Sequence, residues 1–534
     1  MEIADWLLTA ADRGNPATRL DRGREDGVAW TEGNAVRVHI DGREYFARLH
    51  EVLTATVPGD WVYFTDWEGD PDERLAGPGT EIGDVLAGVA RRGVAVRGLL
   101  WRSHSRLANF SEEDNFSFSR RVNEAGGKVV LDHRVRRGGS HHQKLVVVRH
   151  PADPSSDIAF VGGIDLCHGR NDDQRHLGDP QRADLREEHY GERPPWHDLQ
   201  LEVMGPAVND VAATFRERWE DPTPLDTRNP WRALMQRAAK HPDNRGPLAP
   251  ESPIPARGRA AVQVLRTYPA RRKAYPFAPE GERSIARAYL KVFARARSFI
   301  YLEDQYLWSL DATEALRDAL SRQPNLRLLV VIPRYPDPDG GIAGAASRLG
   351  RERVMDGLIA AGGDRVLVCD LENTEGTAIY VHSKICVVDD VWMIVGSDNL
   401  NRRSWTHDSE VSCAVLDDTR DEREPRDPGG VGDGARMLPR ETRLRLWREH
   451  LGRAEGDDAD LVDAESGLVA IRRAAEALDR WHEQGEAGDR PPGHVRVHPR
   501  DRLDGPRRVA LAPVHAHVLD PDGRPRNLAG RGAF

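Results

Sequence analysis

Two stretches of the chain share one pattern: SHHQKLVVVR at residues 140–149 and YVHSKICVVD at residues 380–389. Each places a histidine and a lysine two positions apart at the start of a hydrophobic run. Because successive side chains of a strand point to opposite faces, residues two apart project to the same face. The pattern therefore predicts two strands that each begin with a paired imidazole and amine. The pairs are His142 with Lys144 and His382 with Lys384.

The sequence that follows each stretch is also repeated. A second hydrophobic run ends in a turn of small residues, GGID at residues 162–165 and GSDN at residues 396–399. A carboxylate, Asp198 or Glu410, then opens a further strand. The unit is much longer than a solenoid repeat, so it indicates a duplicated domain. Strands alternating with helices predict an α/β fold, with two homologous α/β sandwich halves packed about a pseudo-twofold axis and the active site between them.

The duplication divides the chain into four predicted segments. An N-terminal half covers residues 1–220, a proline-rich connecting segment 221–258, a C-terminal half 259–455 and an extension 456–534. The connecting segment holds eight prolines, and we expect one short helix within it at Trp231–Lys240.

Local signals add three further predictions. Asp41 and Gly42 follow a run of alternating residues and predict a tight hairpin turn. Residues 417–434 and 455–466 are rich in charged and turn-forming residues, and we expect them to be solvated loops.

The composition bounds the class of protein. With 534 residues, 39% hydrophobic and 30% charged, the chain resembles a globular protein of more than one domain. No apolar run is long enough to cross a bilayer and no signal peptide is evident, so we expect a soluble, cytoplasmic protein, peripheral at most to a membrane. A net charge of −10 argues against a partner that is a nucleic acid. The four cysteines are expected to be buried or neutral thiols; they are Cys167, Cys369, Cys386 and Cys413.

These motifs together resemble the phospholipase D superfamily, whose signature of His, any residue, Lys, four residues and Asp occurs twice. The resemblance covers about residues 30–455 and is closest to the eukaryotic-type branch, while the Ala-, Arg- and Gly-rich composition is typical of a bacterial member. It is carried by residues 141–148, 159–167 with Gly169 and Arg170, 195–198, 299–306 and 379–404.

The residue types suit displacement at an anionic phosphodiester. One imidazole can attack phosphorus to give a covalent intermediate, and a second can protonate the leaving alcohol and then deprotonate water. The resemblance makes the N-terminal histidine the nucleophile, so we expect His142 in that role and His382 as acid and base. Lys144 and Lys384 would donate to the non-bridging oxygens. The scheme requires no metal and no cofactor.

Other polar residues are expected to support this chemistry. Asp198 and Glu410 would hydrogen-bond the outer imidazole nitrogens and so set their tautomers. The residues expected to contact the substrate are Asp66, Gly163, Asp165, Glu303, Ser397 and Asn399. Four tryptophans that follow strands or turns could form an apolar mouth for acyl chains, with core packing as the alternative; they are Trp67, Trp101, Trp308 and Trp405. Arg170, Arg402 and Arg403 flank the turns and could contact phosphate or pair at the surface.

One position departs from the signature of the superfamily. Arg149 stands in the first copy where Asp is expected, whereas the second copy keeps Asp389. This position lies several residues beyond the lysine, so we assign it a supporting role. Asp153 or Asp157 could compensate in the first copy.

The resulting prediction is a phospholipase D that hydrolyses phosphatidylcholine-like lipids to phosphatidic acid and a headgroup alcohol, with possible transfer to another alcohol. The alternatives are a nuclease of the same superfamily, a cardiolipin-synthase-like phosphatidyltransferase and a catalytically silent phospholipid-binding homologue. The expected partner is a phospholipid at a membrane or micelle surface. Since both motifs lie in one chain, a monomer is expected to hold a complete site.

Overall fold

The computed structural model describes the chain except for Met1 and residues 23, 25–26, 104–111, 182–188, 226–244, 336–339, 501 and 530–532. The helix expected at Trp231–Lys240 lies outside the described residues.

The first half is a sheet with strand order β1-β8-β6-β5-β2-β3-β4. Its outer face carries the helices over residues 41–54, 82–91 and 112–124, and its inner face carries the helix over residues 207–220. Strands β2, β3 and β4 run parallel because α3 and α4 connect them, while β5, β6 and β8 pair antiparallel. Its elements are β1 (Thr31–Ile40), α2 (Asp41–Thr54), β2 (Trp61–Asp66), α3 (Ile82–Arg91), β3 (Ala95–Trp101), α4 (Glu112–Glu124), β4 (Lys128–Asp132), β5 (Leu145–Arg149), η4 (Pro154–Ser156), β6 (Ile158–Gly162), β7 (Trp196–His197), β8 (Leu199–Met204) and α5 (Ala207–Glu220).

The second half repeats this arrangement, with strand order β9-β17-β16-β15-β11-β12-β13. Its elements are β9 (Ala260–Tyr268), β10 (Glu282–Arg283), α7 (Ser284–Arg295), β11 (Phe299–Glu303), α8 (Leu310–Arg322), β12 (Arg327–Val331), α9 (Gly340–Gly362), η5 (Gly363–Arg365), β13 (Val366–Leu371), β14 (Tyr380–Val381), β15 (Ile385–Val388), β16 (Trp392–Gly396), α10 (Arg402–Thr406), β17 (Glu410–Leu416) and α11 (Met437–Leu451).

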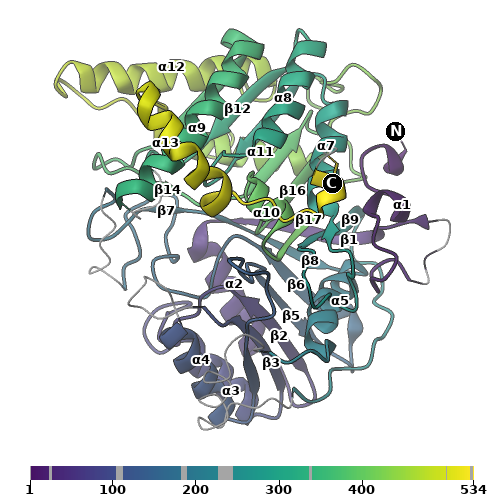
Figure 1. Ribbon diagram of the computed structural model, residues 1–534. Helices are drawn as coiled ribbons and strands as arrows, with labels where there is room; N and C mark the ends of the chain where they lie inside the picture. Colours follow the sequence, from purple (N-terminus) through teal and green to yellow (C-terminus); the bar gives the residue numbers. More distant parts are fainter. Residues whose placement is uncertain are drawn as a thin grey trace.

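The two halves join in two ways (Figure 1). Strand β1 pairs antiparallel with β9, so the strands of both halves follow one hydrogen-bonded order. The inner faces also share one hydrophobic core, to which Val147 and Leu201 contribute from the first half and Val387 and Val411 from the second. Separate cores lie beneath the outer helices of each half. The predicted α/β architecture of two related halves is therefore confirmed.

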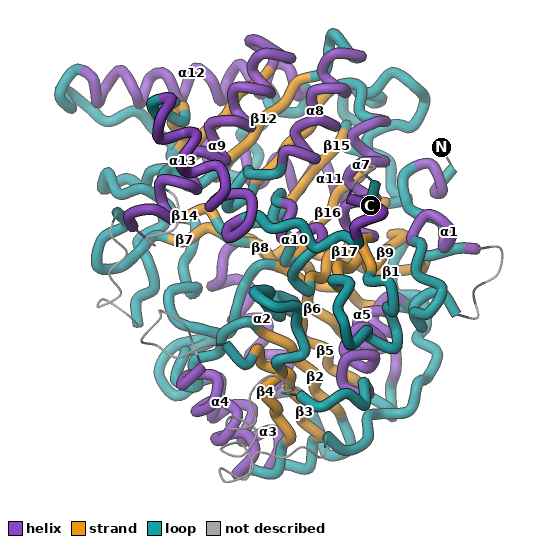
Figure 2. The backbone as a smooth tube through the Cα atoms, viewed as in Figure 1, coloured by secondary structure: helices purple, strands orange, loops and turns teal. Residues whose placement is uncertain are grey.

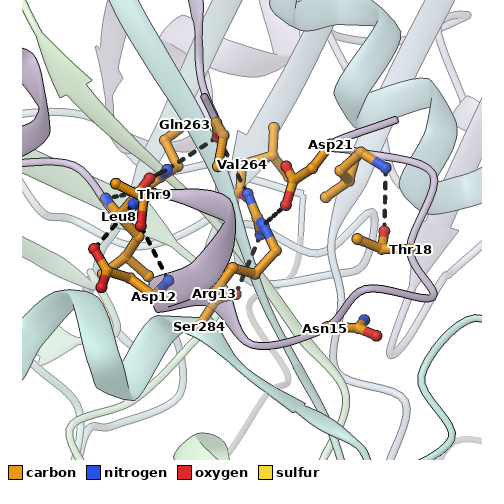
Figure 3. Close-up of polar contacts among 12 residues, drawn as sticks. Leu8, Thr9, Asp12, Arg13, Asn15, Thr18, Asp21, Gln263, Val264 and Ser284 are labelled. Carbon is orange, nitrogen blue, oxygen red and sulfur yellow. Dashed lines mark hydrogen bonds and ion pairs between the residues drawn. The ribbon is translucent and has the colours of Figure 1, made fainter. Parts of the chain in front are cut away.

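The first residues of the chain pack against the second half (Figure 3). Helix α1 (Ala10–Arg13), which follows η1 (Ile3–Asp5), carries a buried guanidinium. Arg13 donates to the carbonyl oxygen of Val264 in β9 at 2.9 Å and pairs with Glu282 at 3.0 Å. Gln263 donates to the carbonyl oxygen of Leu8 at 2.8 Å. These contacts fix the N-terminal segment on β9, beside the junction of the halves.

The C-terminal residues extend the second half. Strand β18 (Val495–Val497) pairs with β13 at the edge of the sheet. Figure 2 shows α12 (Ala464–Glu483) and α13 (Gly505–Val514) on the side of the molecule that the second half occupies. The chain continues through η6 (His515–Leu519) and α14 (Arg526–Ala529).

The hairpin predicted at Asp41 and Gly42 is wrong. Asp41 has the left-handed backbone that such a turn requires, with φ 64°, but α2 begins there. The N–H of Asp41 donates to the carbonyl oxygen of Asp198 at 2.9 Å. A Cβ added at Gly42 would lie 1.7 Å from the carbonyl oxygen of Arg170, so the glycine allows close packing.

The two segments expected to be solvated loops make buried contacts. In the first, Asp433 accepts a hydrogen bond from the indole of Trp6 at 3.1 Å, and Asp421 is buried. In the second, Leu461 joins the inner core, and its carbonyl oxygen accepts a hydrogen bond from Arg443 at 2.8 Å. Only a few residues of each segment make these buried contacts, so the overall composition of the segments stays polar and does not predict them.

Two predictions from composition are also tested by the structure. All four cysteines are free and buried, as expected, and burial raises the pKa of each thiol. Within the part of the chain that the structure describes, every helix is too short or too polar to cross a membrane.

Candidate active site

Backbone hydrogen bonds between the halves bring the two histidine–lysine pairs to the same boundary. The N–H of His142 donates to the carbonyl oxygen of Ser409 at 2.9 Å, and the N–H of His382 donates to that of His197 at 2.8 Å. In both cases the accepting residue directly precedes the other half's carboxylate. Parallel bridges one residue upstream of each histidine extend the same pairing. The pseudo-twofold relation therefore holds at the level of single hydrogen bonds.

The side chains cross between the halves in the same way. Nδ1 of His142 lies 2.9 Å from Oε2 of Glu410, and Nδ1 of His382 lies 2.6 Å from Oδ2 of Asp198. A carboxylate at Nδ1 holds the hydrogen on that nitrogen and leaves Nε2 to face a substrate. Each imidazole therefore depends on the opposite half for its tautomer, a crossing that the sequence spacing did not specify.

The small-residue turns support these carboxylates. Ser397 donates its hydroxyl hydrogen to Oε2 of Glu410 at 2.6 Å. The equivalent position in the first half is Gly163, where an added Cβ would lie 2.1 Å from Oδ1 of Asp198. The side chain of Glu410, which is one methylene longer, thus has a serine beside it, and the shorter side chain of Asp198 has a glycine. Both residues were expected to contact the substrate, but the structure places them against the carboxylates.

The two lysines lie beside their histidines. Nζ of Lys144 donates to the carbonyl oxygen of His142 at 3.2 Å and lies 3.4 Å from Oδ1 of Asp165. Nζ of Lys384 contacts the carbonyl oxygen of His382 and donates to Oε1 of Gln305 at 3.4 Å. Burial lowers the pKa of Lys384 to about 8, although Asp198 acts in the opposite direction.

A pair of aspartates lies behind Lys144. Burial, and then the charge of Asp165, raises the pKa of Asp66 well above its usual range. The pKa of Asp165 falls to about 2 although burial opposes this, because the charge of Lys144 and a hydrogen bond with Asp66 favour the charged form of Asp165. Asn399 occupies the equivalent of Asp165, and its side-chain oxygen is buried with no hydrogen-bond partner among the described residues.

Glu303 does not join this group, so its expected place beside the substrate is wrong. The strand register aligns Glu303 with Ile385, so the residue that corresponds to Asp66 is the next one, Asp304. Asp304 accepts the N–H of Leu400 at 2.6 Å. The Glu303 carboxylate instead lies in a buried cluster, 3.1 Å from Nε2 of His197.

The two histidines differ in their electrostatic surroundings and in their exposure to solvent. Burial lowers the pKa of His382 well below its usual value, and the cations Lys384, Arg170 and Lys144 act in the same direction. Burial also raises the pKa of Asp198 to about 6. His142 is the more accessible of the two, with 16% of its side chain exposed against 7% for His382.

Arg170 is a member of the site that the sequence left undecided. Its guanidinium carbon lies 3.8 Å from the ring centroid of Trp196, and its charge acts on both Asp198 and Asp165. In the sequence, the signals for Arg170 were its position five residues after the GGID turn and its place among the residues that carry the family resemblance. Arg402 and Arg403 instead pair with Asp311 and Asp408, at 2.9 Å and 2.7 Å.

Aromatic rings flank both histidines. Trp67 stacks on Trp101 at 5.5 Å between ring centroids and lies 6.5 Å from the ring of His142. Trp196 lies 5.0 Å from the ring of His382. Trp405 is fully buried in the outer core of the second half, so core packing is the correct interpretation there.

The departure from the signature lies at the far end of the strands. Asp389 accepts the N–H groups of Arg297, Ser298 and Phe299 at 2.8–2.9 Å and so fixes the start of β11. Arg149, at the same position of β5, pairs with Asp157 at 2.6 Å. Both side chains stabilise strand ends opposite to the lysines, which agrees with a supporting role.

Comparisons with known proteins agree with this geometry. The sequence model of the family described as "Phospholipase D" matches residues 70–320 and 367–503, and that of "Cardiolipin synthase, PLD-like domain" matches residues 289–422. The first match covers more than half of the chain. The chain belongs to the phospholipase D family.

Curated relatives extend the similarity over most of the chain. Phospholipase D alpha 2 of Oryza sativa subsp. japonica is 25% identical over 82% of this chain and 67% of its own length. Phospholipase D alpha 1 of Brassica oleracea var. capitata is 26% identical over 89% of this chain and 71% of its own length. Among solved structures, phosphatidylserine synthase of Haemophilus influenzae Rd KW20 matches with a TM-score of 0.49 and 15% identity, over 72% of this chain and 82% of its own.

Proposed function

We propose that this protein is a phospholipase D-type phosphodiesterase that hydrolyses phosphatidylcholine-like lipids to phosphatidic acid and a headgroup alcohol. The observation that carries the proposal is the crossed pairing of each histidine with the carboxylate of the other half, at 2.9 Å and 2.6 Å. Two imidazoles with fixed tautomers and two adjacent lysines match the needs of a double displacement at phosphorus.

In the first step, Nε2 of His142 attacks the phosphorus atom and forms a P–N bond. The bound anionic phosphate, together with the Asp198 carboxylate at Nδ1, would favour the doubly protonated form of His382. The P–O bond to the headgroup breaks, and this imidazolium donates its Nε2 proton to the departing alkoxide. In the second step, His382 takes a proton from water, the oxygen attacks phosphorus and the P–N bond breaks. Phosphatidic acid leaves and both imidazoles return to their starting states, so atoms and charges balance.

The cationic groups stabilise the charge on phosphate. Lys144 and Lys384 would donate to the non-bridging oxygens. The guanidinium of Arg170 and the amide of Asn399 lie in the segments that follow the neighbouring strands, β6 and β16. A preorganised donor of this kind contributes about 10²–10³ to the rate. Asp165 supports this arrangement through its ion pair with Lys144.

The substrate is a phospholipid presented at a membrane or micelle surface, to which the protein binds peripherally. Support comes from the relatives named phospholipase D alpha and from the half-buried Trp67, which packs on the buried Trp101 beside His142 and offers apolar area for acyl chains. Because one chain supplies both histidines, the proposed active unit is a monomer, and nucleic acid is not a proposed substrate.

Transfer of the phosphatidyl group to an alcohol is the second candidate, favoured by the match to the cardiolipin synthase domain over residues 289–422. The same covalent intermediate serves both reactions, and the acceptor decides the product.

Both candidates are tested by incubating the purified protein with phosphatidylcholine micelles and a little ethanol, followed by mass analysis of the lipids. Phosphatidylethanol supports the covalent intermediate and transfer, and phosphatidic acid supports hydrolysis. If neither forms, cleavage of bis(p-nitrophenyl) phosphate distinguishes a different substrate from an inactive site. His382→Asn is the matched inactive control.

A further inference from the structure

A buried group of two histidines and two carboxylates lies beside the catalytic pairs. Asp41 begins α2, His176 lies in the loop between β6 and β7, His197 ends β7 and Glu449 belongs to α11. One nitrogen or oxygen atom of each lies within 4.8 Å of those of the other three. The first three residues are buried, and only 10% of the Glu449 side chain is exposed. Three members come from the first half and one from the second.

The distances within the group suit a shared ion. Nδ1 of His197 lies 3.0 Å from Oδ1 of Asp41 and 3.2 Å from Oε1 of Glu449, which is 3.3 Å from Nε2 of His176. Ligand atoms of a tetrahedral zinc site, each about 2.0–2.1 Å from the ion, lie about 3.3 Å apart. Nδ1 of His197 can carry only one hydrogen, yet carboxylate oxygens of two different residues approach it. A cation at the centre would satisfy both oxygens.

The outer atoms of the group fit the same interpretation. Nε2 of His197 lies 3.1 Å from Oε2 of Glu303, and Nδ1 of His176 lies 3.2 Å from the carbonyl oxygen of Trp196. Histidines that bind a metal through one nitrogen characteristically donate the other N–H to a carboxylate or a backbone carbonyl. In addition, Oδ2 of Asp41 is buried and lacks a hydrogen-bond partner among the described residues.

We propose that Asp41, His176, His197 and Glu449 bind one divalent transition-metal ion, with zinc best matched to the donor set. Two imidazoles favour zinc and its neighbours over calcium or magnesium, which prefer oxygen ligands alone. The carboxylates of Asp41 and Glu449 balance the two positive charges of the ion, which lowers the cost of burying it. A surface pocket of about 610 Å³ has Asp41 and Glu449 in its lining and provides a path for entry.

The ion would hold the catalytic site in place without taking part in the chemistry. The carbonyl oxygen of His197 accepts the N–H groups of His382 and Ser383 at 2.8 Å and 3.2 Å, and the next residue, Asp198, holds the imidazole of His382. Since Glu449 comes from the second half, the ion would also connect the halves directly beside this strand pairing.

The test is the metal content of the full chain, purified without chelators and measured by inductively coupled plasma mass spectrometry. The expected result is one equivalent of zinc or a neighbouring first-row divalent ion. After removal of the metal with a strong chelator, addition of Zn²⁺ is expected to raise the unfolding temperature, because an ion that binds only the folded state stabilises it. Addition of Co²⁺ instead is expected to give the strong visible absorption of a tetrahedral site.

Two variants localise the site. His176→Asn is expected to lose the metal and the response to Zn²⁺, whereas the control His498→Asn, which alters a buried histidine bonded to Asp370, is expected to keep both. A chelator-treated wild-type protein that takes up no Zn²⁺ or Co²⁺ would overturn the proposal, as would full metal content in His176→Asn. The wild-type measurement remains decisive if His176→Asn does not fold.

Discussion

Replacement of Asp198 by Asn tests how the opposite half controls His382. Asp198 is fully buried; its Oδ1 accepts the N–H of Leu199 at 2.8 Å, and its Oδ2 faces Nδ1 of His382 at 2.6 Å. In Asp198→Asn the amide oxygen keeps the bond to Leu199, so the NH₂ group faces His382. Nδ1 must then accept a hydrogen bond, which places the imidazole hydrogen on Nε2 and opposes protonation of the ring.

The expected loss follows from this change of tautomer. The corresponding substitution in a serine-protease triad costs about 10⁴ in kcat, and we expect a fall of about 10³–10⁴ here. That loss corresponds to about 4–5.5 kcal/mol of transition-state stabilisation. Choline release from phosphatidylcholine in mixed micelles measures it; kcat is expected to fall while KM changes little, because Asp198 lies behind the imidazole and does not bind lipid.

A lipid with an acidic leaving group makes the assay specific for the role of His382. Phosphatidyl-p-nitrophenol can lose p-nitrophenolate without a proton, so Asp198→Asn is expected to release about one equivalent rapidly and then to stall at hydrolysis of the intermediate. The matched control is Asp370→Asn, which alters a buried carboxylate 2.9 Å from Nδ1 of His498 and is expected to leave kcat close to wild type. Near-wild-type turnover in Asp198→Asn, or equal loss of the burst and of turnover, would show that Asp198 does not act through the tautomer of His382.

Three further substitutions or conditions have defined outcomes. Because burial lowers the pKa of Lys384 to about 8, kcat/KM of the wild type is expected to fall by up to about 10²–10³ as pH rises through that value. Lys384→Arg is expected to be slow at every pH and to lack this fall, because its guanidinium stays charged. A wild-type pH profile that is flat to pH 10 would contradict the prediction. Gly163→Ala would place a Cβ 2.1 Å from Oδ1 of Asp198 and so displace the carboxylate that holds His382. We expect kcat to fall about 10²-fold with little change in the circular dichroism spectrum. Unchanged activity would show that the Asp198 carboxylate can shift freely. Asp389→Ala removes the acceptor of three backbone N–H groups. We expect the free energy of unfolding in urea to fall by about 1–3 kcal/mol, while the folded enzyme keeps its kcat. Loss of kcat without loss of stability would assign Asp389 to the chemistry.

The repeated pattern of the sequence predicted most of the fold. Mainly hydrophobic runs of four to seven residues at 145–148, 299–302, 326–332 and 411–415 were each predicted to form a strand, and each does. These strands are buried on both faces, so a continuous apolar run identifies them without an alternating pattern. The pairing of β1 with β9, which joins the two sheets, has no local signal, since it depends on residues more than two hundred positions apart. The turn at Asp41 was mistaken because a left-handed residue can open a helix as well as close a hairpin.

The sequence predicted those site residues that recur at matching positions in the two halves, and it missed those that do not recur. Both histidine–lysine pairs and both carboxylates followed from matched spacing, and the structure brings them together across the halves. The choice of Glu303 over Asp304 was an error of one residue, and a one-residue shift along a strand turns the side chain to the other face of the sheet. The cluster around His176 and His197 draws on segments that share no sequence pattern, so only the folded chain reveals it.

The most direct test of the catalytic account is to identify the residue that carries the phosphatidyl group during turnover. The enzyme is mixed with a short-chain phosphatidylcholine, quenched within milliseconds in alkali, which preserves phosphohistidine, and digested for peptide mass spectrometry. We expect a phosphatidyl adduct on His142 that disappears in His142→Asn and persists longer in Asp198→Asn. An adduct on His382, or turnover of substrate by His142→Asn at the wild-type rate, would contradict this expectation.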